Sequence, residues 1–366
     1  MEISDRVLGL IEASGLSRRA FAQRIGLDDS KLSKSLSGTR RFSSLDLARI
    51  AEECGVTVDW LVTGDEPALA VAARTTTGEA RTALDAALDY VSMRAGLASL
   101  GYPQPWRPLS VPLSGPPTAV QGHLLARHAV DRVSEVGLSV SNTDLPATVE
   151  AAFGADVAVL ALDDGFDGLA AASDVAKLIV LATSKVPWRQ RYTLAHELGH
   201  LLAGDDQDVH LDKDVFDKGQ GKDPSEVRAN AFAAAFLMPE AVLRAAAGTT
   251  GLTQQAFAAL ACDLKVSPMA LAIRLSQLRL IDAGACDRLK TLSGVKAASI
   301  VGLGPDYARW IAQATTIRAP GLLVRDAYTA YESGAATLRP YANLLGVDVD
   351  ELRDALELED GIRDAP

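Results

Sequence analysis

The chain has 366 residues, of which 48% are hydrophobic and 23% charged, and its formal net charge is −11. This composition is that of a globular protein rather than a disordered one, and the length predicts two or three domains. No apolar run approaches the roughly 20 residues of a membrane span. The three cysteines are too few and too far apart for a disulfide scaffold, and the N-terminus lacks the pattern of a signal peptide. We therefore expect a cytoplasmic protein with no membrane partner.

Basic residues are concentrated near the N-terminus, although the whole chain is acidic. Residues 17–41 contain seven basic and two acidic side chains, a local charge of +5. A compact basic patch on an acidic chain is typical of a DNA-binding module joined to a larger body. The alternative is a solvated helix face, and charge alone does not separate the two.

The first 64 residues are predicted to form five short helices. Ser17 and Asp28 are candidate N-caps, and Gly15, Gly26 and Gly38 follow the first three helices. The second and third helices are joined by a short turn that contains glycine, which is the helix-turn-helix pattern. The predicted helices are Ile3–Ala13, Arg18–Ile25, Ser30–Leu36, Ser44–Cys54 and Val58–Val62.

This stretch resembles the phage-repressor type of helix-turn-helix, also called the xenobiotic-response-element (XRE) family. Phe21-Ala22, Ile25-Gly26 and Leu36-Ser37-Gly38 match that family's pattern. The resemblance implies that Asp28–Ser35 enters the major groove of a double-stranded DNA operator. The candidate DNA contacts are Ser30, Lys31, Ser33 and Lys34 for base edges and Arg18, Arg40 and Arg41 for phosphates. Asp28 and Asp29 would repel phosphates unless they cap the helix or accept hydrogen bonds from cytosine amino groups. The alternative is a helical protein-interaction module.

Residues 67–116 are predicted to be a helix and a proline-rich linker. The helix Glu79–Leu97 carries an apolar stripe that includes Leu84, Leu88 and Val91, which indicates either core packing or the seam of a homodimer. Six prolines follow within residues 101–117, a pattern typical of a linker or a wrapping arm. We therefore predict four parts, namely a helix-turn-helix domain at 1–66, this linker at 67–116, a second domain at 117–285 and a helical C-terminal region at 286–366.

The second domain is predicted to combine a small sheet with flanking helices. Two short apolar runs read as buried strands, a third lies between them, and proline or glycine marks the ends of the long helices. The fold class is therefore mainly α with a small β-sheet (α+β). The predicted elements are the helix His123–Val136, the strands Asp156–Leu162, 168–173 and Lys177–Ala182, and the helices Pro187–Leu202 and Pro224–Met238.

The helix Pro187–Leu202 carries the motif AHELGH. His196 and His200 are four residues apart, so both project from one helix face, where two imidazoles can bind one zinc ion. Glu197 lies beside them and can take a proton from a water molecule that the metal activates. Zinc is an inference, because such a ligand set also accepts manganese or iron. The alternative is a partly exposed helix that happens to carry two histidines.

A catalytic zinc usually takes three protein ligands and leaves one position open. Asp206 follows the motif at a possible ligand spacing, and His210 lies in a polar loop. Glu226 is a third candidate, in the first turn of the helix Pro224–Met238. There it could instead reach back to the backbone of Asp223 as a capping-box residue. The spacing alone leaves all three open.

A second resemblance bears on this choice. AHELGH, followed by EVRANAFAAAFLMP, is similar to the ImmA/IrrE family of bacterial and phage metallopeptidases, and Arg191-Tyr192-Thr193 match as well. The resemblance covers roughly residues 120–285 and implies a zincin-like fold for them. It implies His196, His200 and Glu226 as metal ligands and Glu197 as the general base. Arg191 and Asn230 we interpret as structural residues, and for Tyr192 packing is favoured over donation to an oxyanion.

The family resemblance also implies a role. Several members cleave a partner repressor of the helix-turn-helix type during a stress or phage response, and strands before the metal helix would bind the substrate by edge pairing. Two other hypotheses stay open. One is a transcription regulator whose metal site is sensory or structural, and the other is a toxin–antitoxin or phage-immunity component that acts by protein contact. The intact Glu197 favours the peptidase, since a structural zinc needs no base.

Two further segments follow the motifs. Thr253–Leu280 again resembles a helix-turn-helix, with its turn at Lys265–Pro268, but it holds few basic residues and is interpreted as a packing element. Residues 286–366 are predicted to be predominantly helical and end in an acidic tail, for which the sequence predicts no role.

Overall fold

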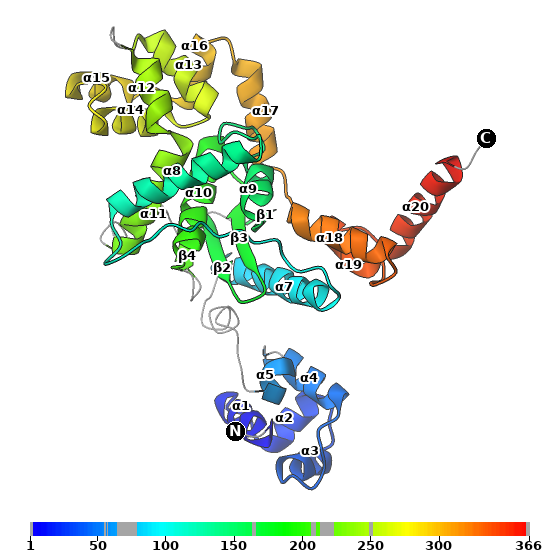
Figure 1. Ribbon diagram of the computed structural model, residues 1–366. Helices are drawn as coiled ribbons and strands as arrows, with labels where there is room; N and C mark the ends of the chain where they lie inside the picture. Colours follow the sequence, from blue (N-terminus) through cyan, green and yellow to red (C-terminus); the bar gives the residue numbers. More distant parts are fainter. Residues whose placement is uncertain are drawn as a thin grey trace. The chain divides into compact units, whose positions relative to one another are not determined.

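The structure, a computed structural model, describes residues 3–54, 56, 58–63, 79–162, 166–205, 210–212, 223–248 and 252–363 (Figure 1). The chain divides into two compact units, Met1–Thr77 and Gly78–Pro366. The predicted fold class, mainly α with a small sheet, is confirmed. The four-part domain division stays a prediction.

The first unit is a small bundle of helices around one apolar core. Each helix begins and ends within one residue of its predicted limits. Phe21, Leu32 and Ile50 are among the side chains that fill the core. Gly26 has a φ of +61°, a left-handed conformation that suits glycine, and it turns the chain between the second and third helices. The helices are α1 (Ile3–Ala13), α2 (Arg18–Arg24), α3 (Asp29–Leu36), α4 (Ser44–Cys54) and α5 (Val58–Thr63).

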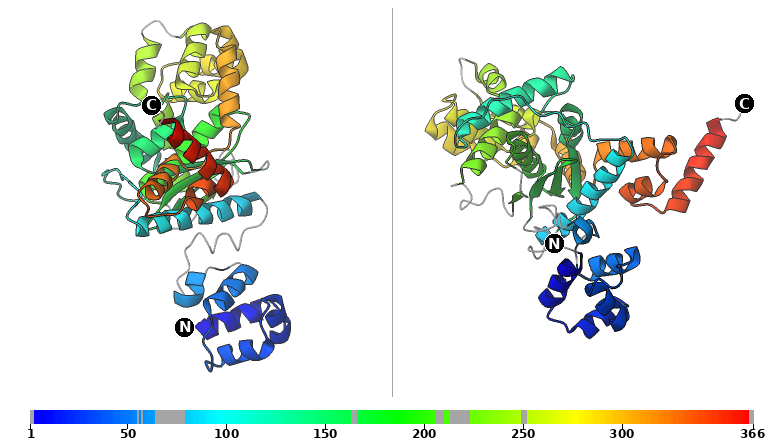
Figure 2. Two further views of the ribbon diagram at one scale, coloured as in Figure 1. Left: turned by 90° about the vertical axis from the view of Figure 1, so that its right-hand side faces the viewer. Right: turned by 60° about the horizontal axis from the view of Figure 1, so that its bottom comes forward.

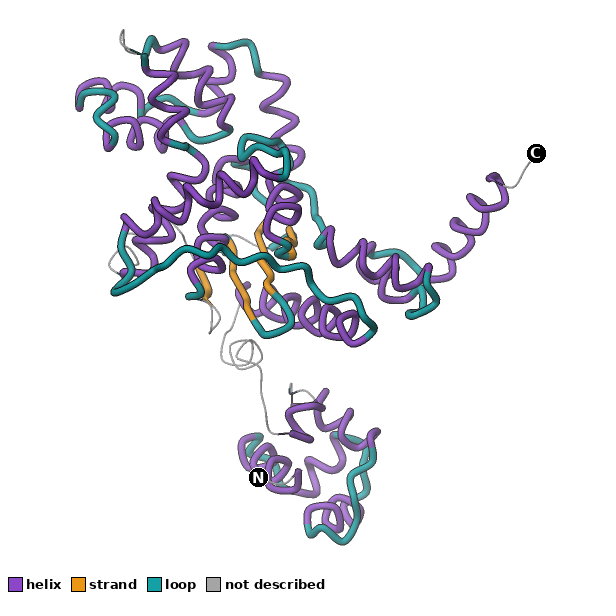
Figure 3. The backbone as a smooth tube through the Cα atoms, in the orientation of Figure 1, coloured by secondary structure: helices purple, strands orange, loops and turns teal. Residues whose placement is uncertain are grey.

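The second unit is built on a sheet in the order β1-β3-β2-β4, a small group of strands among helices (Figure 3). The strands are β1 (Asp156–Leu160), β2 (Gly168–Ala172), β3 (Lys177–Ala182) and β4 (His210–Asp212). β1 pairs parallel with β3, while β2 pairs antiparallel with both β3 and β4. Side chains on both faces of β1 and β3 are buried, which explains their continuous apolar runs. The predicted strands are present, and β4 is an addition that the sequence did not indicate.

Helix α10 (Pro187–Ala203) packs against β2 and β3 and also against α11 (Pro224–Leu237). α11 lies in turn along α8 (Ala119–Glu135), and Gly122 lets the two approach closely. A Cβ atom at Gly122 would lie 2.3 Å from the Arg228 carbonyl oxygen. α9 (Leu145–Phe153) leads into β1, and α12 (Glu240–Ala247) follows α11. Helix α10, which carries the AHELGH motif, is thus held between the sheet and α11.

Much of the segment predicted as a linker packs on the second unit. α7 (Glu79–Ser99) contacts β3, and its Leu84 is fully buried, which is the core-packing alternative for the apolar stripe. The proline-rich arm follows α9 and the sheet, because the Arg107 backbone N–H donates to the Phe153 carbonyl and Gln104 hydrogen-bonds to the Lys177 backbone. The arm therefore wraps the unit. The homodimer stays a prediction.

The C-terminal helices return to the sheet. The backbone of Arg318 bridges Val159 on β1 through two hydrogen bonds of 2.8 and 2.9 Å. The orange α18 then lies against the cyan α7 (Figure 2). These helices are α13 (Gln254–Leu264), α14 (Pro268–Gln277), α15 (Ala283–Leu289), α16 (Gly294–Ile300), α17 (Gly304–Ala314), α18 (Gly321–Glu332), α19 (Arg339–Leu345) and α20 (Val349–Arg363). Within the ranges that the structure describes, no single helix has the length and apolar composition of a membrane span.

Candidate metal centre

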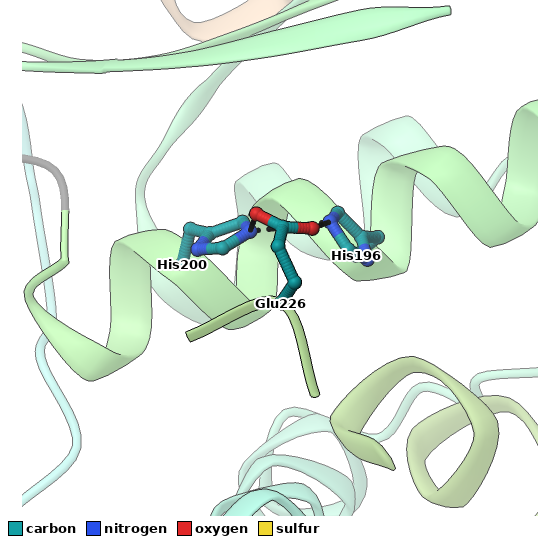
Figure 4. A group of neighbouring side chains, drawn as sticks. All are labelled: His196, His200 and Glu226. Atoms are coloured by element: carbon teal, nitrogen blue, oxygen red, sulfur yellow. Dashed lines mark hydrogen bonds and ion pairs between the residues drawn. The ribbon is translucent and has the colours of Figure 1, made fainter. Parts of the chain in front are cut away.

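Three buried side chains meet where α10 and α11 adjoin (Figure 4). His196 and His200 come from successive turns of α10, and Glu226 comes from the first turn of α11. The Nε2 atoms of the two histidines lie 3.1 Å apart. The Glu226 carboxylate reaches both, with one oxygen 3.2 Å from His196 Nε2 and the other 3.3 Å from His200 Nε2. The structure thus brings together the ligand set that the family resemblance implied.

Local features of the sequence explain this convergence. Asp223 caps α11 by accepting from the Ser225 backbone N–H at 2.8 Å, which places Glu226 in the first turn. Gly199 lies on the α11 side of α10, where a Cβ atom would stand only 2.9 Å from the Phe232 ring. A larger residue at Gly199 would push α10 and α11 apart. The motif's glycine therefore sets the distance between the histidines and the glutamate.

The electrostatics of the cluster favour positive charge. Burial alone would lower the pKa of His200, but hydrogen bonds to Asp205 and Glu226 and the charge of Glu197 outweigh it and raise the pKa to about 10. Burial alone would raise the pKa of Glu226, yet hydrogen bonds from His196 and His200 hold it well below its ordinary range. A site that stabilises protonated imidazole in this way also suits a bound cation, which would replace the proton.

The residues present fit a tetrahedral metal ion. Ligand atoms at zinc distances of about 2.0–2.1 Å in tetrahedral geometry stand about 3.3 Å from one another. The Nε2 atoms of His196 and His200 are 3.1 Å apart, each lies 3.2–3.3 Å from a different Glu226 oxygen, and one ligand atom from each of the three residues lies within 4.8 Å of the others. Two imidazoles and one carboxylate are also a donor set that zinc accepts. Of the other two candidates for the third ligand, Asp206 and the side chain of His210 lie outside the described residues.

Glu197 is buried beside this cluster, next to the strand β2. A Cβ atom at Gly168 on β2 would lie 3.3 Å from Glu197 Oε1 and 2.7 Å from Thr193 Cγ2. The absence of a side chain at Gly168 therefore lets the strand backbone approach the carboxylate. This is a suitable place for a base that acts on a substrate lying along the sheet, although the role of Glu197 stays a prediction.

Asp205 is a site residue that the sequence analysis missed. Its Oδ2 atom lies 3.2 Å from His200 Nδ1, and its other oxygen accepts from Arg228 on α11. Gly204, with a φ of +72°, ends α10 and turns the chain back so that Asp205 faces His200. A carboxylate on the far nitrogen of a metal-binding histidine fixes the tautomer and orientation of the ring. An acidic residue directly after a glycine helix end was the available signal.

We predict that Asp205→Asn weakens metal binding by about 10–100-fold, because removing the carboxylate partner leaves the His200 ring less basic and less well oriented. Competition with a chromophoric chelator measures this affinity. Asp131→Asn, which changes an exposed residue of α8 in the same way, should bind metal like the wild type. An unchanged affinity in Asp205→Asn would show that the contact is incidental.

The neighbouring motif residues make internal contacts. Arg191 donates to the backbone carbonyls of Val140 and Asn142 at 2.6 and 2.8 Å, which ties α10 to the loop before α9. The Tyr192 hydroxyl donates to Asn230 Oδ1 on α11 at 2.9 Å. These contacts agree with the structural interpretation of Arg191 and Asn230 and with packing for Tyr192.

The first unit presents most of its candidate DNA contacts on the surface. Six of the seven are exposed, namely Arg18, Ser30, Lys31, Ser33, Lys34 and Arg41. Arg40 instead donates to Ser35 and to the buried Asp46 at 3.0 and 2.8 Å, so it has an internal role that the sequence did not indicate. Asp28 accepts from the Ser30 backbone N–H at 2.9 Å and caps α3, which removes the discordance of an acid at this position. The DNA contacts themselves stay predictions.

We expect Arg41→Ala to weaken DNA binding at every sequence and to lower the slope of log affinity against log salt by about 1, since a single phosphate contact is lost. Anisotropy titrations of labelled duplex DNA at several salt concentrations measure the slope. Arg353→Ala, an exposed arginine of α20 that pairs with Asp350, should leave the slope unchanged. If Arg41→Ala keeps the wild-type salt slope, Arg41 does not contact a DNA phosphate.

The arrangement as a whole, a buried two-histidine and one-glutamate cluster on adjoining helices behind a small sheet, suits a metal-dependent hydrolase. Comparison with known proteins agrees with it, because residues 135–276 match the family described as the IrrE N-terminal-like domain. Residues 10–61 match a helix-turn-helix domain family. The chain therefore carries an IrrE-like domain together with a helix-turn-helix domain.

A curated protein is similar to part of this chain. It is the radiation response metalloprotease IrrE of Deinococcus radiodurans, with 39% identity over 94 residues. The matched segment is 25% of this chain and 28% of the relative. The match thus spans little more than a quarter of that protein.

Proposed function

We propose that the protein is a DNA-binding regulatory zinc peptidase that cleaves a partner transcriptional repressor in a stress or phage-immunity response. The observation that carries the proposal is the convergence of His196, His200 and Glu226 at ligand spacing, with Glu197 buried beside them. A structural zinc would ordinarily take four protein ligands and would need no base. In the described part of the chain, the cluster holds three ligands.

When bound, zinc lowers the pKa of a water molecule to about 7 and polarises a carbonyl group. His196, His200 and Glu226 would hold the ion, and manganese would be accepted by the same set. Glu197 takes the proton from the attacking water and then delivers it to the leaving amine. Asp205 holds His200 in the tautomer that leaves Nε2 free to bind.

The sheet limits where an extended substrate can pair. The family resemblance implies that the substrate pairs with the edge of a strand that precedes α10. In the described residues, however, the outer edge of β1 is bridged by Arg318, and β2 pairs with β4. Pairing of a substrate would therefore use β4, which follows the metal helix, or would displace it.

The regulatory part of the proposal draws on the domain combination. A helix-turn-helix domain in the same chain would place the peptidase near an operator, where a repressor is also found. The similar protein from Deinococcus radiodurans is a radiation response metalloprotease. Both observations support a protein substrate among regulators of stress genes.

The test is to incubate the purified protein, with zinc or manganese supplied, with helix-turn-helix repressors encoded near its gene, and to analyse the products by mass spectrometry. We expect a defined cut in one repressor by the wild type, and none by Glu197→Gln with its metal bound. Cleavage by neither protein, with metal bound and DNA shifted by both, would instead favour a metal-stabilised transcription regulator. A tight partner whose binding survives removal of the metal would favour a component that acts by protein contact.

A further inference from the structure

A large groove begins one helical turn from the proposed metal ligands. Its volume is about 910 Å³, and its walls come from α8, α10, α11 and α14. Tyr192 and Asn230 are part of the lining. Tyr192 lies four residues before His196 on α10, and Asn230 lies four residues after Glu226 on α11. Residues at this spacing are neighbours on a helix face. The groove therefore adjoins the metal centre along both helices.

The walls of the groove expose apolar side chains. Met269 and Ile273, one turn apart on α14, are 56% and 43% exposed. Val186, just before α10, and Val227 on α11 are also exposed and belong to the same lining. Single exposed apolar residues are common, but several around one groove indicate a surface that binds another chain.

The charge of the groove differs from that of the chain. The chain has a net charge of −11, yet the lining contains two arginines and no carboxylate. Arg189 is paired with Asp167 at 2.6 Å, which neutralises it. Arg274 is 4% exposed, and the charge of Glu240 acts on it, but no carboxylate among the described residues lies within the 4.0 Å of an ion pair. The groove thus holds a buried cation that makes no direct ion pair, because its nearby carboxylate, Glu240, is paired with Arg244 instead.

The contacts of Arg274 leave part of its guanidinium available. One terminal nitrogen donates to His123 Nε2 at 3.1 Å, while the Nε atom has no hydrogen-bond partner in the part of the chain that is described. Burial and the charge of Arg274 lower the pKa of His123, so this ring is a neutral acceptor. A guanidinium has five N–H donors and favours a carboxylate partner. Leaving such a charge buried and unpaired is costly.

We propose that this groove binds the substrate protein beside the scissile bond and selects an apolar segment that carries an acidic side chain, which pairs with Arg274. The proposal rests on the proposed function, because it places the substrate next to the proposed catalytic centre. It also gives a role to the segment Thr253–Leu280. Its first helix, α13, is largely buried, whereas α14 turns Met269, Ile273 and Arg274 toward the groove.

The test measures peptide binding to the full-length protein carrying Glu197→Gln, so that cleavage does not interfere. The probes are fluorescein-labelled leucine–alanine peptides with one glutamate, placed at each position in turn, and matched peptides with glutamine there. We expect the best glutamate peptide to bind roughly tenfold tighter than its glutamine partner, since a charged hydrogen-bond pair is formed in a desolvated site. This preference should vanish when Arg274→Gln is added.

Two variants serve as controls. Arg353→Gln removes an exposed arginine of α20 that pairs with Asp350, away from the groove lining, and should keep the full preference. Ile273→Ser alters only the exposed wall, so the fold is retained, and it should weaken both peptides equally. Equal binding of glutamate and glutamine peptides, a preference that survives Arg274→Gln, or no binding of either peptide at millimolar concentration would overturn the proposal.

The same experiment keeps the two proposals apart, because binding is measured without cleavage. If the protein prefers glutamate peptides but cleaves no repressor, the groove proposal stands and the peptidase proposal fails. If it cleaves a repressor but shows no such preference, the reverse holds.

Discussion

Glu197→Gln should reduce the rate of repressor cleavage by about 10²–10⁴-fold, the range that a positioned general base contributes. Glutamine has nearly the same shape as glutamate but cannot accept the proton of the attacking water. The side chain is fully buried on α10, beside the proposed ligand His196. Because Glu197 is not among the three proposed ligands, metal content should stay at the wild-type level. Single-turnover cleavage and metal analysis of the same samples provide both measurements.

The control for this prediction is Glu135→Gln at the end of α8, where the side chain is 69% exposed and the same chemical change should have no effect on cleavage. A Glu197→Gln protein that binds metal and cleaves at the wild-type rate would remove Glu197 from the chemistry. If the metal itself were lost, Glu197 would instead be required to form the site.

Most of the candidate metal site could be predicted from the sequence because three of its four residues are local. His196, Glu197 and His200 lie on a single helix whose ends are marked by Pro187 and Gly204, and i, i+4 spacing fixes which side chains share a face. The third ligand is not local. Its spacing to α10 depends on how α11 packs, so the residues alone left Asp206, Glu226 and His210 open until the family resemblance favoured Glu226.

The parts that sequence reasoning missed depend either on a local reversal of the chain or on packing between distant segments. Asp205 contacts His200 only because Gly204 reverses the chain. Likewise, no local pattern shows that Arg318 would extend the edge of β1, or that Arg94 on the predicted linker helix would meet Asp326 on α18, 232 residues away. Periodicity gave the helices, but it carries no information about which helices touch.

Arg94 joins three elements of the second unit. Its guanidinium binds Asp156 on β1 through two hydrogen bonds of 2.9 and 2.7 Å and Asp326 on α18 through one of 2.5 Å. All three side chains are buried. Asp326 also accepts from the exposed Arg325, and Asp156 from Gln104. The triad therefore ties α7 and the C-terminal helices to the first strand of the sheet.

Arg94→Leu should lower the free energy of unfolding of the second unit by about 3–5 kcal/mol, because removing one partner of a buried ion pair leaves charge in the interior without compensation. Urea unfolding at neutral pH measures the loss. Arg81→Leu, on the same helix, breaks only the exposed pair with Asp85 and should cost at most about 1 kcal/mol. Equal losses in the two variants would mean that the triad adds nothing beyond a surface ion pair.

The pH dependence of Arg94→Leu gives an independent check on the cause. Burial already raises the pKa of Asp156, and hydrogen bonds from Arg94 oppose this increase. Removing the Arg94 guanidinium should therefore raise the pKa of Asp156 further. A carboxyl group whose folded pKa lies above its unfolded value of about 3.9 destabilises the fold as pH rises through the folded pKa. The stability deficit of Arg94→Leu should therefore be largest at neutral pH and shrink as the pH falls and Asp156 takes up a proton.

Adding Asp156→Asn and Asp326→Asn to Arg94→Leu should recover most of the lost stability at pH 7, since the uncompensated charges are then gone. A deficit that is the same at all pH values and persists in the triple variant would assign the loss to the packing of the arginine side chain instead of its charge.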